Sequence, residues 1–160
     1  MGTRQGGSLN ASLNFIRPTD PEDASRMSEI DRVTSPNPRS EAQYEDCCRA
    51  AGGEQALVCE RERQVLGFVV YSRILDEASI NNIAVDPGQQ GTGVGRTLLC
   101  AALEIMREAG AGVCHLEVRA SNKTARSLYQ SLGFQTDGRR KNYYRTDTGR
   151  EDALLMSLAL

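Results

Sequence analysis

The sequence predicts a mixed α/β (α+β) fold, in which one central and mostly antiparallel sheet is flanked by helices. Short runs rich in Val, Ile and Leu are separated by glycines or charged turns, which is typical of strands. Two of these runs are followed by segments with the apolar period of an amphipathic helix. The length of 160 residues, with 39% hydrophobic and 25% charged residues, fits one soluble globular domain.

The first half of the chain carries both helix and strand signals. In chain order, the expected elements are a strand at 12–18, helices at 21–33 and 40–50, and strands at 54–60, 64–75 and 77–85. Pro21 and the acidic residues after it are typical of a helix start. The segment 34–40 contains two prolines and is expected to be a loop. The charged residues 61–63 are expected to form the turn of a hairpin.

The second half contains two strand-helix units and a closing hairpin. The expected elements are a helix after a glycine-rich turn, a strand at 113–120, a helix at 122–133, and strands at 134–144 and 151–160 joined by 145–150. One stripe of the first helix is expected to carry Leu98, Leu99, Ala102, Leu103 and Met106. Asn122 fits the N-cap of the second helix, and Gly133 fits its end.

The chain is expected to form a single domain over residues 12–160, preceded by a flexible tail at 1–11. This tail lacks the apolar segment of a secretory signal, and no apolar run reaches the ~20 residues of a membrane span. The five cysteines are odd in number and have no CxxC spacing, which argues against a disulfide framework and a structural zinc site. Cys114 and His115 point to opposite faces of their strand, which argues against a Cys-His nucleophile. We therefore expect a cytoplasmic protein without a metal.

The formal net charge of −2 argues against nucleic acid as a direct partner of the molecule as a whole. A local basic cluster is formed by Arg139, Arg140, Lys141 and Arg145. Such a cluster is most often a solvated surface and less often an anion site. We expect neither a nucleic-acid partner nor a membrane partner, and we favour a monomer.

The stretch "VDPGQQGTGVGRTLLCAALEIM", residues 85–106, places four glycines within eight residues directly before a helix. A dinucleotide-binding Gly-x-Gly-x-x-Gly motif fails, because Arg96 or Leu98 stands where the third glycine is required. A P-loop also fails, because its lysine is replaced by Arg96. What remains is Gln90-x-x-Gly93-x-Gly95, which exposes backbone N–H groups at the positive end of a helix and suits a pyrophosphate. The alternative is a purely structural strand-to-helix turn.

Two stretches carry a family resemblance, "NNIAVDPGQQGTGVGRTLL" and "LEVRASNKTARSLYQSLGF". Five motifs in order extend it: "DEASINNIAVDP", "LEVRASN", "LYQSLGF", "RRKNYY" and "GREDALLMSL". Together they resemble the Gcn5-related N-acetyltransferase (GNAT) superfamily, whose acetyl-coenzyme A signature is Gln/Arg-x-x-Gly-x-Gly/Ala. Within it, they are most similar to the enzymes that acetylate the N-terminal alanine of a small-subunit ribosomal protein. The resemblance covers about half of the chain, and it implies acetyl-coenzyme A as the donor and that ribosomal-protein N-terminus as the acceptor.

The resemblance also implies roles for individual residues. Coenzyme A is expected to contact Ile83, Ala84, Val85, Gln90, Gly91, Thr92, Gly93, Val94, Gly95, Arg96 and Asn122. Glu117 in "LEVR" matches the general base of the superfamily, and Tyr129 in "LYQSLGF" matches its general acid. The simpler alternatives are that Glu117 pairs with a neighbour such as Arg119, and that Tyr129 is a packing residue.

The chemistry of acetyl transfer is consistent with these roles. An α-amino group is roughly 10% neutral at pH 7, whereas a lysine amine is well under 0.1% neutral, so an N-terminal acceptor has an advantage. A carboxylate must accept the amine's proton, and an acid should protonate the departing thiolate. The strand period of two puts Glu117 on one face with His115 and Arg119. Asn122 and Tyr129 are two helical turns apart and can face the same ligand.

The developing oxyanion also needs a hydrogen-bond donor. We expect a backbone N–H near Val85 to supply it, at a point where the strand bulges to admit the cofactor.

Two departures from the family pattern concern the ligands. The enzymes it resembles have an arginine in the phosphate turn where this chain has Gln89, Gln90 and Gly91, which is expected to weaken phosphate attraction. They also have a Pro-Trp segment where this chain has residues 32–44 and no tryptophan, so the acceptor can differ. Tyr143 and Tyr144 are either part of a peptide groove or ordinary exposed strand aromatics.

Two other functions stay open. One is acetylation of lysine side chains or small amines by the same fold, which an acidic acceptor pocket would favour. The other is a non-catalytic module that binds acyl-coenzyme A. Such a module would need neither Glu117 nor Tyr129, and both residues are present.

Overall fold

The structure is a computed structural model that describes residues 13–160; the tail expected at 1–11 lies outside the described residues. Seven strands form one sheet in the order β1-β2-β3-β4-β5-β7-β6, and every neighbouring pair is antiparallel except β4 and β5. The strands are β1 (Phe15–Pro18), β2 (Glu54–Arg61), β3 (Gln64–Ile74), β4 (Glu77–Val85), β5 (Val113–Arg119), β6 (Gln135–Thr146) and β7 (Gly149–Ala159). The mixed, mostly antiparallel sheet is confirmed.

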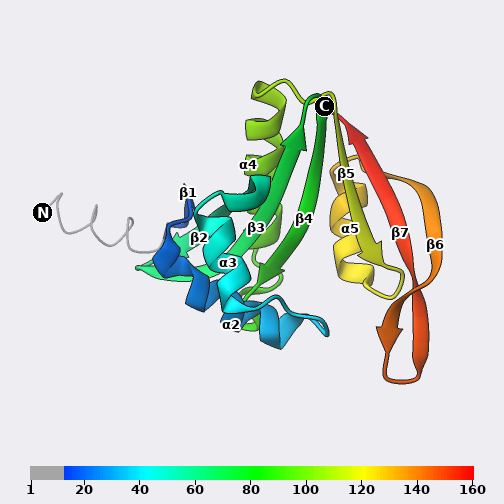
Figure 1. The fold of residues 1–160 in the computed structure, drawn as a ribbon, viewed down its shortest axis with the longest axis horizontal. Coiled ribbons are helices and arrows are strands. Elements are labelled where there is room, and N and C mark those ends of the chain that lie inside the picture. Colours follow the sequence, from blue (N-terminus) through cyan, green and yellow to red (C-terminus); the bar gives the residue numbers. More distant parts are fainter. Residues whose placement is uncertain (1–12) are drawn as a thin grey trace, which may run out of the picture.

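Helices cover both faces of this sheet (Figure 1). They are α2 (Ala24–Thr34), α3 (Glu41–Cys48), α4 (Val94–Glu108) and α5 (Lys123–Ser131), with 3-10 turns η1 (Pro21–Asp23), η2 (Ala51–Gly53) and η3 (Pro87–Gln89). One core lies between α2, α3 and the face of β2 and β3 that carries Val58 and Phe68. A larger core lies between α4, α5 and the opposite face. The expected apolar stripe of α4, from Leu98 to Met106, is buried in it.

The parallel pair β4–β5 opens a gap in the middle of the sheet. Residues 77–79 of β4 pair with 113–115 of β5, and no further pairs follow along the two strands. Figure 1 shows β4 and β5 diverging from this point. The register of β4 against β3 shifts between Ile80 and Asn82, so Asn81 is the bulged residue. The expectation of a bulge near Val85 is wrong, because Val85 pairs regularly with Gly67.

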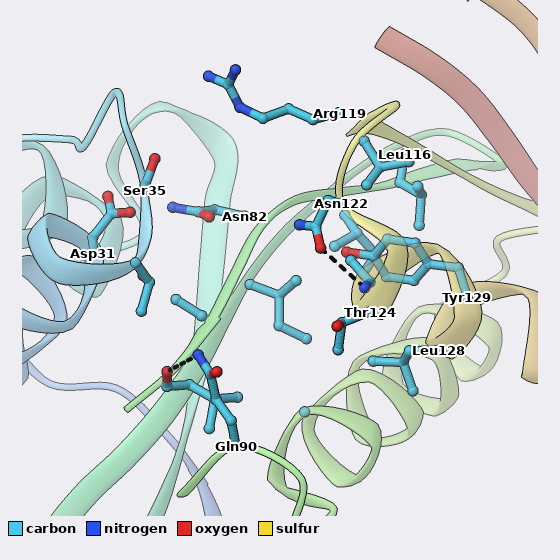
Figure 2. A pocket seen from close by; sticks show the side chains of 18 of the residues that line it. Asp31, Ser35, Asn82, Gln90, Leu116, Arg119, Asn122, Thr124, Leu128 and Tyr129 are labelled. Atoms are coloured by element: carbon cyan, nitrogen blue, oxygen red, sulfur yellow. Dashed lines mark hydrogen bonds between the residues drawn. The ribbon is translucent and has the colours of Figure 1, made fainter. Parts of the chain in front are cut away.

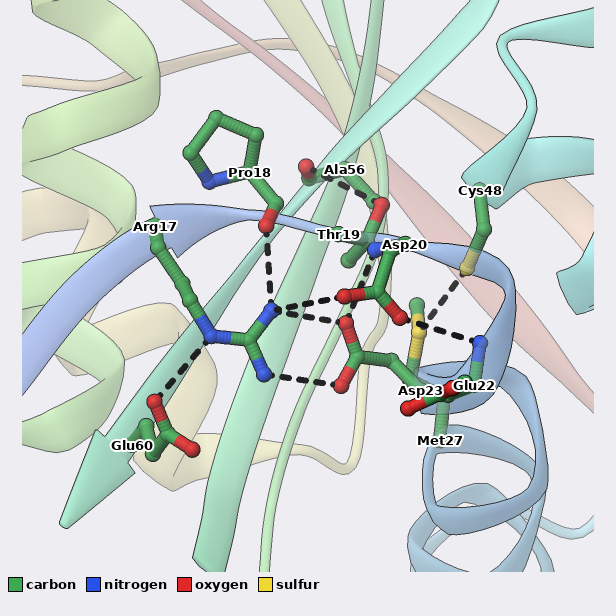
Figure 3. A network of polar contacts seen from close by, with 10 residues as sticks. All are labelled: Arg17, Pro18, Thr19, Asp20, Glu22, Asp23, Met27, Cys48, Ala56 and Glu60. Atoms are coloured by element: carbon green, nitrogen blue, oxygen red, sulfur yellow. Dashed lines mark hydrogen bonds and ion pairs between the residues drawn. The ribbon is translucent and has the colours of Figure 1, made fainter. Parts of the chain in front are cut away.

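A network of ion pairs fastens β1 to the start of α2 (Figure 3). Arg17 contacts Asp23 through two hydrogen bonds of 2.8 and 2.9 Å, and its Nε is 3.1 Å from Glu60 on β2. Burial works to raise the pKa of Asp23, but hydrogen bonds from Arg17 and from the Asp20 amide outweigh it and hold that pKa below its ordinary value. Asp20 and Asp23 form a capping box, so Pro21–Asp23 is a separate 3-10 turn and the helix expected from 21 begins at Ala24.

The closing hairpin is longer than expected. The connection expected at 145–150 is reduced to Asp147 and Thr148, because β6 and β7 continue to Thr146 and from Gly149. The register of β6 shifts between Arg140 and Tyr144, and Asn142 has a positive φ of 53°. Residues 141–143 of β6 thus lie opposite the single residue Asp152 of β7. Such extra residues bend a strand locally and change the direction of its side chains.

Gly67 on β3 lies close against the backbone of β4, and this close approach yields a stability prediction. A Cβ there would lie 2.8 Å from the Ala84 carbonyl oxygen and 3.3 Å from the Val85 Cα. Since these atoms belong to backbone, Gly67→Ala is expected to reduce the free energy of unfolding by about 1–3 kcal/mol, measured by urea denaturation. Gly112→Ala is the matched control, because its nearest neighbour would be 4.0 Å away. Equal stabilities of the two variants would contradict the prediction.

Candidate active site

A cavity of about 650 Å³ lies in the gap between β4 and β5. Of the residues expected at the site, those that line it are Ile83, Ala84, Val85, Gln90, Gly91, Gly93, Val94, Gly95, Arg96, Glu117, Asn122 and Tyr129. Figure 2 shows Gln90 at one end of this group and Asn122 and Tyr129 further along. Thr92 is the exception: its hydroxyl donates to the Gln89 carbonyl at 2.5 Å, so it closes the turn and does not face the cavity.

The glycine turn leads directly into α4. Gly91 and Gly93 have positive φ values of 79° and 90°, which other residues rarely adopt, and Gly93 is the N-cap. No side chain caps this end of α4 within the described residues, and its first residues, 93–96, line the cavity, so their N–H groups are available to a ligand there. Gly95 brings the helix close to Val85, because a Cβ there would lie 3.5 Å from Cγ2 of that valine. The turn therefore has the geometry that suits a pyrophosphate.

Two arginines lie beside this turn. Arg96 donates to the Ser131 hydroxyl on α5 at 2.9 Å. Arg61, at the end of β2, donates to the Gln89 side chain at 2.9 Å and so brings a cation to a turn that lacks its usual arginine. Sequence reasoning missed Arg61, because it is distant in the chain and belongs to a charged hairpin turn.

Helix α5 brings Asn122 and Tyr129 to the same cavity, as expected. The Asn122 side chain accepts a hydrogen bond from the Ala125 amide at 3.2 Å, which confirms it as the N-cap and leaves its amino group for other partners. Tyr129 is 4% exposed and packs against Phe134, with ring centroids 5.8 Å apart. Burial raises the pKa of Tyr129 to about 12. Its phenol therefore stays protonated at physiological pH.

Strand β5 presents Glu117 as its alternation predicts. His115 and Glu117 are exposed on one face, whereas Cys114, Leu116 and Val118 are buried on the other. The ion-pair partner of Glu117 is Arg140 on β6, at 3.4 Å. The alternative in which Glu117 pairs with Arg119 is not observed, because Arg119 pairs with Glu151 at 3.0 Å.

Tyr144 completes this side of the cavity. The Arg119 guanidinium lies 4.2 Å above the centre of its ring. Tyr144 lines the cavity, whereas Tyr143 is 47% exposed and does not. Within the basic cluster, Arg140 pairs with Glu117 and Arg139 pairs with Asp152 at 2.8 Å. Two of its four cations are thus already neutralised by carboxylates.

The end of the cavity opposite the glycine turn is polar. Asp31, at 2% exposure, accepts hydrogen bonds from the Tyr44 hydroxyl at 2.5 Å and the Arg39 amide at 2.9 Å. The Asn82 amide in turn donates to the Tyr44 hydroxyl at 2.7 Å. Burial, followed by the contact with Asp31, raises the pKa of Tyr44 above its ordinary value. Sequence reasoning missed this network, and the available signal was a carboxylate at position 31, four residues after Met27 on the buried stripe of α2.

The cysteines carry no cross-link in the folded chain. All five cysteines are free, and burial raises the pKa of Cys114 to about 12. Across residues 13–160, no group of three or more His, Cys, Asp or Glu side chains is arranged to hold a metal ion. None of the helices in the described part of the chain is long and apolar enough to cross a bilayer.

The fold is that of the acetyltransferase (GNAT) family. The sequence model of the acetyltransferase (GNAT) family matches residues 23–134, and the chain belongs to this family. It is similar to the ribosomal protein bS18-alanine N-acetyltransferase of Escherichia coli K12, with 45% identity over 97 residues. That match covers 61% of this chain and 66% of the relative, slightly less than two thirds of its length.

Solved structures show the same likeness. The crystal structure of the ribosomal-protein-S18-alanine N-acetyltransferase from Escherichia coli matches with a TM-score of 0.85 and 35% identity, covering 92% of this chain and 94% of that chain. Arabidopsis thaliana NAA60 in complex with acetyl-CoA matches with a TM-score of 0.84 at 17% identity, covering 92% and 99%. The second match is a likeness of fold alone.

Proposed function

We propose that this protein is an acetyl-coenzyme A-dependent protein N-α-acetyltransferase that modifies the N-terminal alanine of a small-subunit ribosomal protein. The observation that carries the proposal is one continuous cavity that joins the N-terminus of α4 to Glu117 and Tyr129. The 45% identity to the Escherichia coli enzyme supports the acceptor. A ribosomal-protein acceptor would place the activity in the cytoplasm, and the expected monomer stays a prediction.

The donor half of the cavity fits acetyl-coenzyme A. The uncapped N–H groups of α4 would bind the pyrophosphate, aided by Arg96 and Arg61. Ile83, Ala84 and Leu128 line the cavity with apolar side chains, which suits pantetheine. The amino group of Asn122 would donate to the donor, since its oxygen is used as a helix cap. No metal is required for this chemistry.

The acceptor would react by direct attack on the thioester carbonyl. Its ammonium group gives a proton to Glu117, directly or through water, and the neutral amine then forms the new C–N bond. The C–S bond breaks as the carbonyl re-forms, while the Tyr129 hydroxyl donates a hydrogen bond to the departing thiolate. The new amide nitrogen loses its second proton, which reaches the thiolate through water and gives the free thiol. The proton held by Glu117 then passes to solvent. No acyl-enzyme forms, because both substrates meet in one cavity.

A turnover assay with two peptides tests this function. Free thiol release from acetyl-coenzyme A is measured with a peptide that begins with a free N-terminal alanine, beside an N-blocked peptide that contains lysine. We expect turnover of the free N-terminus at least about a hundredfold faster, since far more of its amine is neutral at pH 7. Modification of lysine alone would instead support the side-chain or small-amine acetyltransferase. Tight cofactor binding without turnover of any amine would support the binding module.

A further inference from the structure

A second cavity, of about 490 Å³, adjoins the first on the other side of Glu117. Five residues line both cavities: Ile80, Asn81, Leu116, Glu117 and Tyr144. The second cavity is additionally lined by Arg140 and Asp137 from β6. The side chain of Glu117 is 33% exposed, so sheet packing alone does not fix its carboxylate. The contacts of the carboxylate therefore determine which of the two cavities it faces.

Arg140, on the edge strand β6, forms an ion pair with the Glu117 carboxylate. It lies on β6 opposite Ala153 of β7, which in turn lies opposite Arg119 of β5. Ala153 is fully buried, and its small side chain lets the long Arg140 side chain pass over β7 toward Glu117. The Arg140 guanidinium ends 3.4 Å from Glu117 and 5.2 Å from the centre of the Tyr143 ring. Tyr143 thus supports the arginine from outside the cavity.

The other charged or titratable groups around Glu117 form ion pairs with other residues, carry a negative charge like Glu117 itself, or are neutral. Those facing it from β5, β6, β7 and β4 are His115, Arg119, Asp137, Tyr144, Glu151 and Glu77. Arg119 is paired with Glu151, and His115 lies 3.5 Å from Glu77. Within the described residues, Arg140 is therefore the cation that contacts the Glu117 carboxylate.

We propose that Arg140 is a positioning residue for Glu117, which holds the carboxylate oriented at the boundary of the two cavities. The inference rests on the proposed function, in which Glu117 accepts the acceptor's proton. A carboxylate that is already held in place by its partner loses less freedom in the transition state. Arg140 itself takes no proton in the reaction.

A double-mutant cycle tests the proposal through turnover of the free N-terminal peptide. Arg140→Gln is expected to lower kcat about tenfold, while the KM for acetyl-coenzyme A changes less than about twofold. In a Glu117→Gln background the same change is expected to have less than about a twofold effect, because the group that Arg140 positions is absent. Arg140→Lys, which keeps the charge, is expected to recover part of the loss. Arg139→Gln is the matched control, because Arg139 is equally exposed and pairs with Asp152 outside both cavities.

The outcomes separate the inference from the function on which it rests. An equal loss from Arg140→Gln in both backgrounds would show a structural role and overturn the inference. A loss no larger than that of Arg139→Gln would overturn it as well. If the unmodified protein acetylates no amine, the proposed function fails and the inference falls with it. Arg140 is 52% exposed, so its replacement is not expected to prevent folding.

Discussion

Replacement of Glu117 by glutamine is expected to lower kcat for the N-terminal peptide by about 10²–10⁴-fold, the usual contribution of a general base. Glutamine keeps the shape of the side chain but cannot accept the proton of the incoming ammonium. The remaining activity depends on amine that is already neutral, so it should rise with pH up to about 8, where an α-amino group becomes mostly neutral. Steady-state assays of thiol release between pH 6 and 9 measure both effects.

Glu77→Gln provides the control for this experiment. Glu77 is also a strand carboxylate, at the start of β4, but it is more exposed and contacts His115 outside the first cavity. We expect its replacement to leave kcat within about twofold of the unmodified protein. If the Glu117→Gln variant keeps half of the activity, or shows the same pH profile as the unmodified protein, then Glu117 is not the general base.

The parts of the site that follow from local patterns could be predicted from the sequence. Alternation along β5 places Glu117 on the polar face, and the period of α5 brings Asn122 and Tyr129 to one side. The glycines of the turn before α4 also have the expected backbone geometry. These features depend on residues within a few positions of one another, so the periodicity of a strand or helix determines them.

The parts that were missed depend on contacts between distant segments. The Asp31–Tyr44–Asn82 network joins α2, α3 and β4, and the position of Asp31 on the buried stripe of α2 does not identify its partners. The partner of Glu117 could not be identified for the same reason, since Arg140 reaches it across β7. The bulge at Asn81 is set by the pairing of β4 with β3, which sequence periodicity does not reveal.

Replacement of Tyr129 by phenylalanine is expected to lower kcat by about 10²-fold, with little change in the free energy of unfolding. Burial raises the pKa of Tyr129 to about 12, whereas a thiol has a pKa near 8.5, so full proton transfer to the thiolate is uphill by about 3.5 pKa units. The hydroxyl therefore acts mainly as a hydrogen-bond donor to the departing sulfur, a contribution of the kind made by one oxyanion-hole donor. The phenylalanine ring keeps the packing against Phe134.

The pH dependence distinguishes this donor role from proton transfer by a titrating acid. Because Tyr129 stays protonated well above pH 9, the ratio of the two kcat values should be constant between pH 6 and 9. Tyr143→Phe is the matched control, because that tyrosine does not line the cavity, and its kcat should change less than about twofold. A Tyr129→Phe defect that disappears as pH rises through 9 would indicate that the phenol ionises in this range and acts as a true acid. A variant with unchanged kcat would instead assign Tyr129 to packing alone, where burial keeps its hydroxyl away from the reacting sulfur.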